Sequence, residues 1–143
     1  MTHPTEPLAL KKVVYKDLNS RQKETYNFHR VAGRLAEYEY NSILLSDDWL
    51  GADFIAYHND GKRFYRVQLK GRMTIDDKYT GKDLFIAFVD GNRVYVYPHD
   101  EMANRIDAAD RINNSSSWSK YRSYSWPGVT SWLRNLLDEF EVK

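Results

Sequence analysis

Apolar residues recur along this chain at two different spacings, and the change of spacing divides it into helices and strands. From Asn19 to about Tyr40 they recur three and four residues apart, which predicts a helix with a buried stripe of Phe28, Val31, Ala32 and Leu35. Asn19, followed by Gln22 three residues later, has the form of a capping box and predicts where the helix starts. The first regular element is therefore an amphipathic helix.

Alternating apolar and polar positions over residues 51–70 predict two strands joined by a tight turn at Asn59-Asp60-Gly61. If Asp60 and Gly61 form a two-residue type I′ turn, counting outward places Asp53 directly opposite Gln68. Opposed residues of a strand pair point to the same face of the sheet. Lys70 shares that face because strand side chains alternate. The open end of this hairpin is thus predicted to gather a carboxylate, an amide and an ammonium.

The remaining pattern predicts further strands and two more helices. Strands are expected at 43–45, 84–89 and 93–97, and helices at 100–107 and 129–141, with long loops at 71–83 and 112–126. The expected fold class is α+β with a three-layer tendency. Its element order is helix, three strands, two strands and C-terminal helices, on a mainly antiparallel or mixed central sheet. One domain, 1–143, is expected, divided into an irregular lead (1–17, with a short edge strand at 12–16), a core (18–97) and a C-terminal part (98–143).

Composition narrows the class of protein. The 143 residues are 42% hydrophobic and 29% charged, as in a soluble globular domain, and no apolar run is long enough to span a membrane. There is no cysteine, so disulfides and thiolate metal sites are excluded. Together with an N-terminus that lacks the apolar core of a signal peptide, this predicts a cytoplasmic protein.

The net charge of +1 is uninformative, but its distribution is uneven. Residues 61–82 carry seven basic and two acidic side chains, with tyrosines between them. Such a segment suits a phosphate backbone, and a solvated strand edge explains the charges equally well. The nucleic-acid contacts predicted from it are Arg66, Arg72, Lys78 and Lys82.

The residues predicted to meet at the hairpin have the chemistry of a divalent-metal site. Mg²⁺ prefers oxygen ligands and needs only one or two carboxylates. Asp53 supplies a carboxylate, while the side-chain oxygen of Gln68 and the backbone carbonyl of Leu69 supply neutral ligands. Glu24, on the apolar stripe of the first helix, either joins the site or is a solvated acid favoured by the helix dipole. Lys70 would orient the attacking water or stabilise charge on a phosphate.

At this point the chain resembles the PD-(D/E)xK nuclease superfamily, the fold of many restriction endonucleases. The resemblance rests on Glu24, on Ala52-Asp53 in place of Pro-Asp, and on Gln68-Leu69-Lys70 in place of Glu-x-Lys, and it covers roughly residues 18–97. It implies that Glu24, Asp53 and Gln68 are metal-site residues and that Lys70 is the catalytic lysine. Gln68 removes one negative charge from the usual pattern, which lowers the expected metal affinity. The runs LSDDWLGADFI, VQLKGR and YPHDE also look like those of a group of short bacterial proteins.

The resemblance implies a nuclease that depends on Mg²⁺ or Mn²⁺, cleaves phosphodiester bonds, favours DNA, and acts as a homodimer in many relatives. The alternative is an inactive nuclease-fold module that binds nucleic acid or a protein partner. A third reading makes the aromatic-rich loop at 112–126 an interaction surface. Three other features each have two possible explanations. His99 either lines a pocket or caps the following helix, and Asp47 and Asp48 either add acids to the site or cap a turn. The aromatic residues of the loop at 112–126 either stack on bases or anchor the loop on the sheet.

Overall fold

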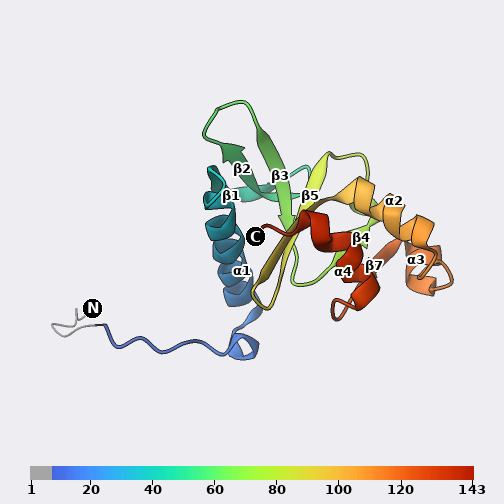
Figure 1. Cartoon of the computed structure of the whole chain (residues 1–143), viewed down its shortest axis with the longest axis horizontal. Helices are drawn as coiled ribbons and strands as arrows, with labels where there is room; N and C mark the ends of the chain where they lie inside the picture. The colour runs from blue at the N-terminus through green and yellow to red at the C-terminus, as the bar shows by residue number, and fades with distance from the viewer. Residues whose placement is uncertain (1–7) are drawn as a thin grey trace.

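The structure, a computed structural model, describes residues 8–143, so the first seven residues of the predicted lead lie outside it. Its elements follow the predicted order (Figure 1). They are η1 (Tyr15–Asp17), α1 (Ser20–Ala36), β1 (Tyr40–Trp49), β2 (Ala52–His58), β3 (Phe64–Leu69), β4 (Thr74–Asp76), η2 (Asp77–Tyr79), β5 (Leu84–Asp90), β6 (Arg93–Pro98), α2 (His99–Ala109), α3 (Ser116–Tyr121), β7 (Ser123–Ser125), α4 (Ser131–Leu137) and η3 (Asp138–Phe140).

A five-stranded mixed sheet in the order β1-β2-β3-β5-β6 forms the centre of the molecule. Only β3 and β5 pair in parallel, and the other neighbours are antiparallel. Helix α1 packs on one face through a cluster of buried residues that includes Phe28, Phe54 and Val67. The C-terminal helices lie on the other side of the sheet (Figure 1), and a larger cluster of buried residues, which includes Ile86, Met102 and Leu133, packs between them and the sheet. The predicted α+β fold with a three-layer, mixed-sheet architecture is confirmed.

Helix α1 begins where its sequence predicted. The side chain of Asn19 accepts the N–H of Gln22 at 2.8 Å, and the Gln22 side-chain oxygen accepts the N–H of Asn19 at 2.9 Å, so both halves of the capping box form. The helix ends at Ala36 rather than near Tyr40, because the chain turns there and Glu39 adopts a positive φ of 67°.

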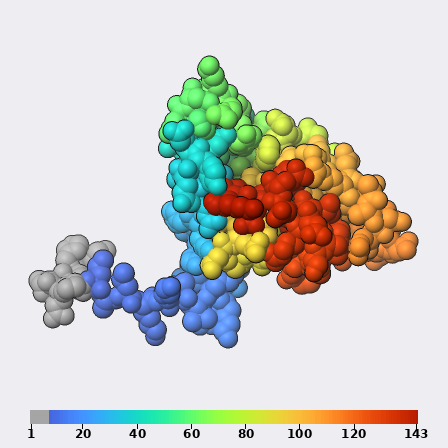
Figure 2. Space-filling model, in the orientation of Figure 1, coloured from blue at the N-terminus to red at the C-terminus, as the bar shows by residue number. Residues whose placement is uncertain are grey.

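The segment before α1 lacks the edge strand predicted at 12–16. The 3₁₀ turn η1 takes part of its place. Residues 8–14 are exposed and extend away from the body of the molecule, as the blue segment in Figure 2 shows. The strand is absent because this stretch of chain does not reach the edge of the sheet, whose two outer strands are β1 and β6.

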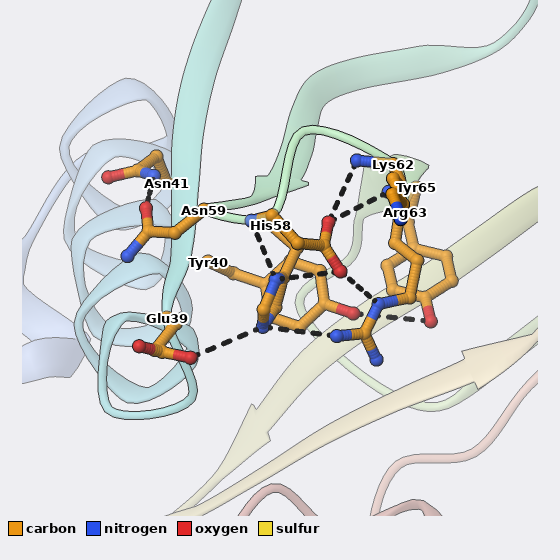
Figure 3. Close-up of polar contacts among 9 residues, drawn as sticks. Glu39, Tyr40, Asn41, His58, Asn59, Lys62, Arg63 and Tyr65 are labelled. Carbon is orange, nitrogen blue, oxygen red and sulfur yellow. Dashed lines mark hydrogen bonds and ion pairs between the residues drawn. The ribbon is translucent and has the colours of Figure 1, made fainter.

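The hairpin of β2 and β3 has the predicted register but a different turn. Its strand pairs run from Tyr57 opposite Phe64 to Phe54 opposite Val67, and one further step in this register sets Asp53 against Gln68. The predicted two-residue turn is wrong: the N–H of His58 donates to the carbonyl of Arg63 at 2.8 Å, which closes a four-residue loop. Figure 3 shows this end of the hairpin, where His58, Arg63 and neighbouring polar side chains form a hydrogen-bonded network.

A turn with the type I′ pattern lies instead between β1 and β2. Leu50 and Gly51 have φ values of 53° and 90°, and Trp49 pairs with Ala52 across them. Strand β1 thus continues up to this turn and is far longer than the predicted strand at 43–45. The register of its pairing with β2 is irregular between Leu44 and Trp49, where its polar residues lie.

The loops expected at 71–83 and 112–126 contain short regular elements. Strands β4 and β7 pair with each other, and Ile75 lies opposite Tyr124. Trp118 and Trp126 are buried in the larger core, so they anchor this region, which is one of the two explanations considered for the loop aromatics. His99 is also buried, at the start of α2, and its Nε2 accepts the N–H of Asp76 at 3.0 Å. It ties α2 to β4 and lines none of the pockets described below.

Candidate functional site

One pocket of about 400 Å³ lies at the open end of the β2–β3 hairpin, beside the first turns of α1. It is lined by all five residues predicted from sequence to form the metal and catalytic site, namely Glu24, Asp53, Gln68, Leu69 and Lys70. They come from three segments: the helix α1, the start of β2 and the end of β3. The fold thus brings together residues up to 46 positions apart (70 − 24) in a single concavity.

Asp53 is the half-buried carboxylate of this pocket. Its Oδ2 accepts the backbone N–H of Leu69 at 2.9 Å, so the side chain is held against the end of β3. Burial raises the pKa of Asp53 above its ordinary value, and the nearby carboxylates of Glu24 and Asp48 raise it further. The Leu69 N–H and the Lys70 ammonium oppose this rise in the pKa without cancelling it. The folded protein therefore disfavours the charged form of Asp53 relative to water.

Lys70 follows directly after β3 and is fixed at both its backbone and its side chain. Its N–H donates to the carbonyl of Ala87 at 2.9 Å, which extends the parallel pairing of β3 and β5 by one residue. Its Nζ lies 5.3 Å from the centroid of the Tyr79 ring, within the range of a cation–π contact. No ion pair among residues 8–143 includes Lys70. The ammonium is positioned, and its charge remains available to a ligand.

The neutral donors are Gln68 and Leu69. The amide nitrogen of Gln68 lies 3.4 Å from the carbonyl oxygen of Leu69, a long contact between two groups that were both predicted as ligands. Glu24, in the second turn of α1, is exposed on the opposite wall of the pocket. Within residues 8–143, no group of three or more His, Cys, Asp or Glu side chains has a metal-binding arrangement. A cation here would depend on two carboxylates and neutral oxygens.

The basic residues predicted to contact nucleic acid do not line this pocket. Arg66 is largely enclosed: its guanidinium stacks on Trp49 at 5.3 Å, donates to the carbonyl of Lys82 and lies 3.9 Å from the carboxylate of Asp83. Its observed contacts hold the start of β5 against β3. Arg72 and Lys78 are exposed, and Lys82 is half-buried. The Lys78 ammonium shares the Tyr79 ring with Lys70, at 5.1 Å.

Several pocket residues were not predicted from the sequence. Asn27 is buried, and its Nδ2 donates to the hydroxyl of Tyr15 at 2.8 Å, while Lys23 and Ser20 complete the wall of α1. The only sequence signal for Asn27 is its place three residues after Glu24, on the same side of the helix. Asp48 was predicted either as a site acid or as a turn cap. It accepts the N–H of Gly51 at 2.6 Å as a cap, and its charge also acts on Asp53.

Comparisons with known proteins identify a likeness of fold. No family model and no curated protein sequence matches the chain. Among solved structures, a bacterial homing endonuclease, I-Ssp6803I, is similar, with a TM-score of 0.44 and 19% sequence identity over 58% of this chain and 67% of that chain. Within residues 8–143, no helix has the length and apolar character needed to cross a membrane.

Proposed function

We propose that this chain is a metal-dependent nuclease that hydrolyses phosphodiester bonds of nucleic acid, with DNA as the favoured substrate. The observation that carries the proposal is the single pocket in which Glu24, Asp53, Gln68, Leu69 and Lys70 meet. Acidic oxygens beside an unpaired ammonium are the groups that phosphodiester hydrolysis requires. The raised pKa of Asp53 belongs to the same place, and perturbed pKa values are common at functional sites.

The donor set of the pocket fits Mg²⁺ or Mn²⁺. Two carboxylates, from Asp53 and Glu24, and the neutral oxygens of Gln68 and Leu69 suit a hard cation that keeps several of its waters. Because Oδ2 of Asp53 already accepts the Leu69 N–H, Oδ1 is the atom with most freedom to bind. A positive charge would also relieve the raised pKa of Asp53. When bound, such an ion supplies Lewis acidity and lowers the pKa of water.

The chain's own residues would orient the substrate and stabilise charge. Lys70, held over Tyr79, can donate hydrogen bonds to a non-bridging phosphate oxygen while negative charge develops there. The Leu69 N–H keeps the Asp53 carboxylate in one orientation and so preserves the geometry between the acid and the ammonium. The half-buried setting of Asp53 and Lys70 strengthens both interactions relative to water.

A second candidate function is a non-catalytic module of the same fold that binds nucleic acid. Two observations favour it: Gln68 stands where the resembled family usually has an acid, and residues 8–143 contain no cluster of three metal-binding side chains. Such a module would bind nucleic acid without cleaving it.

The test is cleavage of plasmid and of single-stranded DNA with Mg²⁺ or Mn²⁺, combined with calorimetric titration of each metal. We expect the wild type to cleave and to bind metal, and Asp53→Ala to reduce the cleavage rate at least ~100-fold and to weaken metal binding. The matched control is Asp60→Asn, which removes a carboxylate at the other end of the same hairpin and should cleave at the wild-type rate.

Intact DNA with both metals, together with no calorimetric signal at millimolar metal, would contradict the nuclease proposal. If nucleic acid still binds under those conditions, the second candidate is supported instead.

A further inference from the structure

A second, smaller pocket adjoins the candidate site along α1. It has a volume of about 210 Å³ and shares Tyr15, Asn27 and Gly71 with the larger pocket. From there it extends past Tyr26 and Arg30 to Val89, near the end of β5, and to Gly91 in the turn that follows. The two pockets therefore form adjoining parts of one depression that starts at Asp53 and Lys70 and runs along the helix.

The wall of this depression is a cluster of two aromatic rings and two cations. The rings of Tyr15 and Tyr26 lie 5.6 Å apart at 53°, and Asn27 holds Tyr15 through its hydroxyl. The ammonium of Lys23 lies 5.4 Å from the Tyr15 ring, and the guanidinium of Arg30 lies 5.7 Å from the Tyr26 ring. Each cation is thus associated with one ring of the pair.

Neither cation is neutralised by a carboxylate. No ion pair among residues 8–143 includes Lys23 or Arg30, whereas Arg34, on the same helix, pairs with Glu37 and donates to the carbonyls of Asn92 and Val142. Arg34 is used to hold the C-terminal segment, while Lys23 and Arg30 keep their charge for a ligand. Paired rings with unpaired cations form the kind of surface that stacks bases and binds phosphates in single strands.

The spacing of the cluster suits a short length of one strand. Lys23, Tyr26, Asn27 and Arg30 are three, four and seven residues apart and so share one side of α1. Seven residues of helix rise by about 10 Å, which equals roughly three steps of a strand whose bases stay stacked at the duplex rise of about 3.4 Å. The cluster lies directly beside the pocket that holds Asp53 and Lys70.

We infer that Tyr15, Lys23, Tyr26 and Arg30 form a subsite for an unpaired nucleic-acid strand and guide it to Asp53 and Lys70. The inference rests on the proposed nuclease function and deepens it by naming the substrate as single-stranded nucleic acid. It also moves the main nucleic-acid interface from the basic segment at 61–82 to α1 and the turn before it.

The experiment measures binding without catalysis. Fluorescence anisotropy in EDTA compares a labelled single-stranded DNA oligonucleotide with a blunt duplex of the same length, for the full-length chain. We expect tighter binding of the single strand and a loss of at least ~5-fold in its affinity for Tyr15→Ala and for Arg30→Ala. Replacing both Lys23 and Arg30 with Ala should reduce the slope of log affinity against log salt by about 1.4, because each phosphate that a side chain no longer neutralises removes ~0.7.

Two controls separate a binding role from a structural one. Arg21→Ala removes an exposed cation of α1 that lines neither pocket, and it should leave the affinity for single strands unchanged. Arg111→Ala removes an exposed guanidinium that lies 4.9 Å from the Trp132 ring, a similar cation–aromatic pair among the C-terminal elements, and should leave binding unchanged. If Tyr15→Ala alters the circular dichroism spectrum, Arg30→Ala and the salt slope still decide the question.

Wild-type affinity in Arg30→Ala and an unchanged salt slope in the double variant would overturn the subsite, as would a preference for duplex. The two proposals can fail separately. Subsite-dependent binding without cleavage in Mg²⁺ overturns only the nuclease function. If the wild type cleaves nucleic acid but the subsite variants bind single strands with wild-type affinity, only the subsite is overturned.

Discussion

The β2–β3 hairpin carries an aspartate at each end, and the two are held in opposite ways. At the turn, Asp60 accepts the backbone N–H groups of Lys62 and Arg63 and pairs with the Arg63 guanidinium at 2.9 Å. These contacts, with the Lys62 N–H contributing most, lower the pKa of Asp60 to about 2. At the open end, burial and neighbouring acids raise the pKa of Asp53, which accepts one backbone N–H.

The charge of Asp60 therefore stabilises the fold, whereas the charge of Asp53 weakens it. Asp60 has its charge satisfied by its own turn, with His58 completing the network (Figure 3). The fold disfavours the charged form of Asp53, and among residues 8–143 no cation of the protein lies within ion-pair distance of it. Local arrangements that weaken folding are expected at functional sites, so the contrast itself supports the open end as the working end.

The largest expected effect is on the cleavage rate, and it should distinguish Lys70 at the open end of the hairpin from Arg63 at the turn. Lys70→Ala should lower the cleavage rate at least ~100-fold with little effect on thermal stability, because the ammonium acts on the substrate's developing charge. Arg63→Ala should do the reverse, with a rate within about twofold of wild type and a lower unfolding temperature. Single-turnover cleavage and thermal denaturation of both variants measure this. Wild-type cleavage by Lys70→Ala would remove that residue from the site.

The next effect is on stability at the turn. Asp60→Asn should lower the unfolding temperature at pH 7 by about 3 °C. Because the folded-state pKa of Asp60 is lowered, its charge stabilises the protein above its unfolded pKa of about 3.9, and this contribution is lost as the pH falls toward 2. Urea denaturation at pH 7, 4 and 3 should therefore show the gap between wild type and variant narrowing with acidity. A gap independent of pH would mean that the charge of Asp60 does not stabilise the turn.

The register of β2 against β3 could be predicted although the turn was predicted wrongly. Hairpin register depends on where the loop is centred, and a two-residue and a four-residue loop centred on Asp60-Gly61 give the same opposed pairs. The helix start at Asn19 was equally predictable, because a capping box is a local pattern.

Features that depend on distant contacts could not be predicted in this way. Tyr15 lines the pocket, where Asn27 donates to its hydroxyl across twelve residues of sequence, and neither residue signals this contact locally. The length of β1 was not predicted because the polar residues in its second half are typical of a turn. The turn at Leu50 was not predicted either, because leucine rarely adopts the positive φ found there. The contacts of Arg66 with Trp49 and with the Lys82 carbonyl could not be predicted either, since charge alone does not reveal them.

The smallest effect is also the sharpest test of the contrast, because it has the opposite sign to that at Asp60. Asp53→Asn keeps an oxygen that can accept the Leu69 N–H but removes the charge, so it should raise the unfolding temperature at pH 7 by about 1–2 °C. The folded-state pKa of Asp53 is raised, so ionisation weakens folding as the pH rises from about 3.9 through that folded value. The difference in unfolding temperature between the variant and the wild type should therefore be absent in acid. It should grow as the pH rises through that interval and stay constant at higher pH. Thermal denaturation from pH 3 to pH 8 without added metal measures it. A variant less stable than wild type at pH 7 would show that the Asp53 charge is satisfied within the fold, as that of Asp60 is, and would remove the distinction between the two ends of the hairpin.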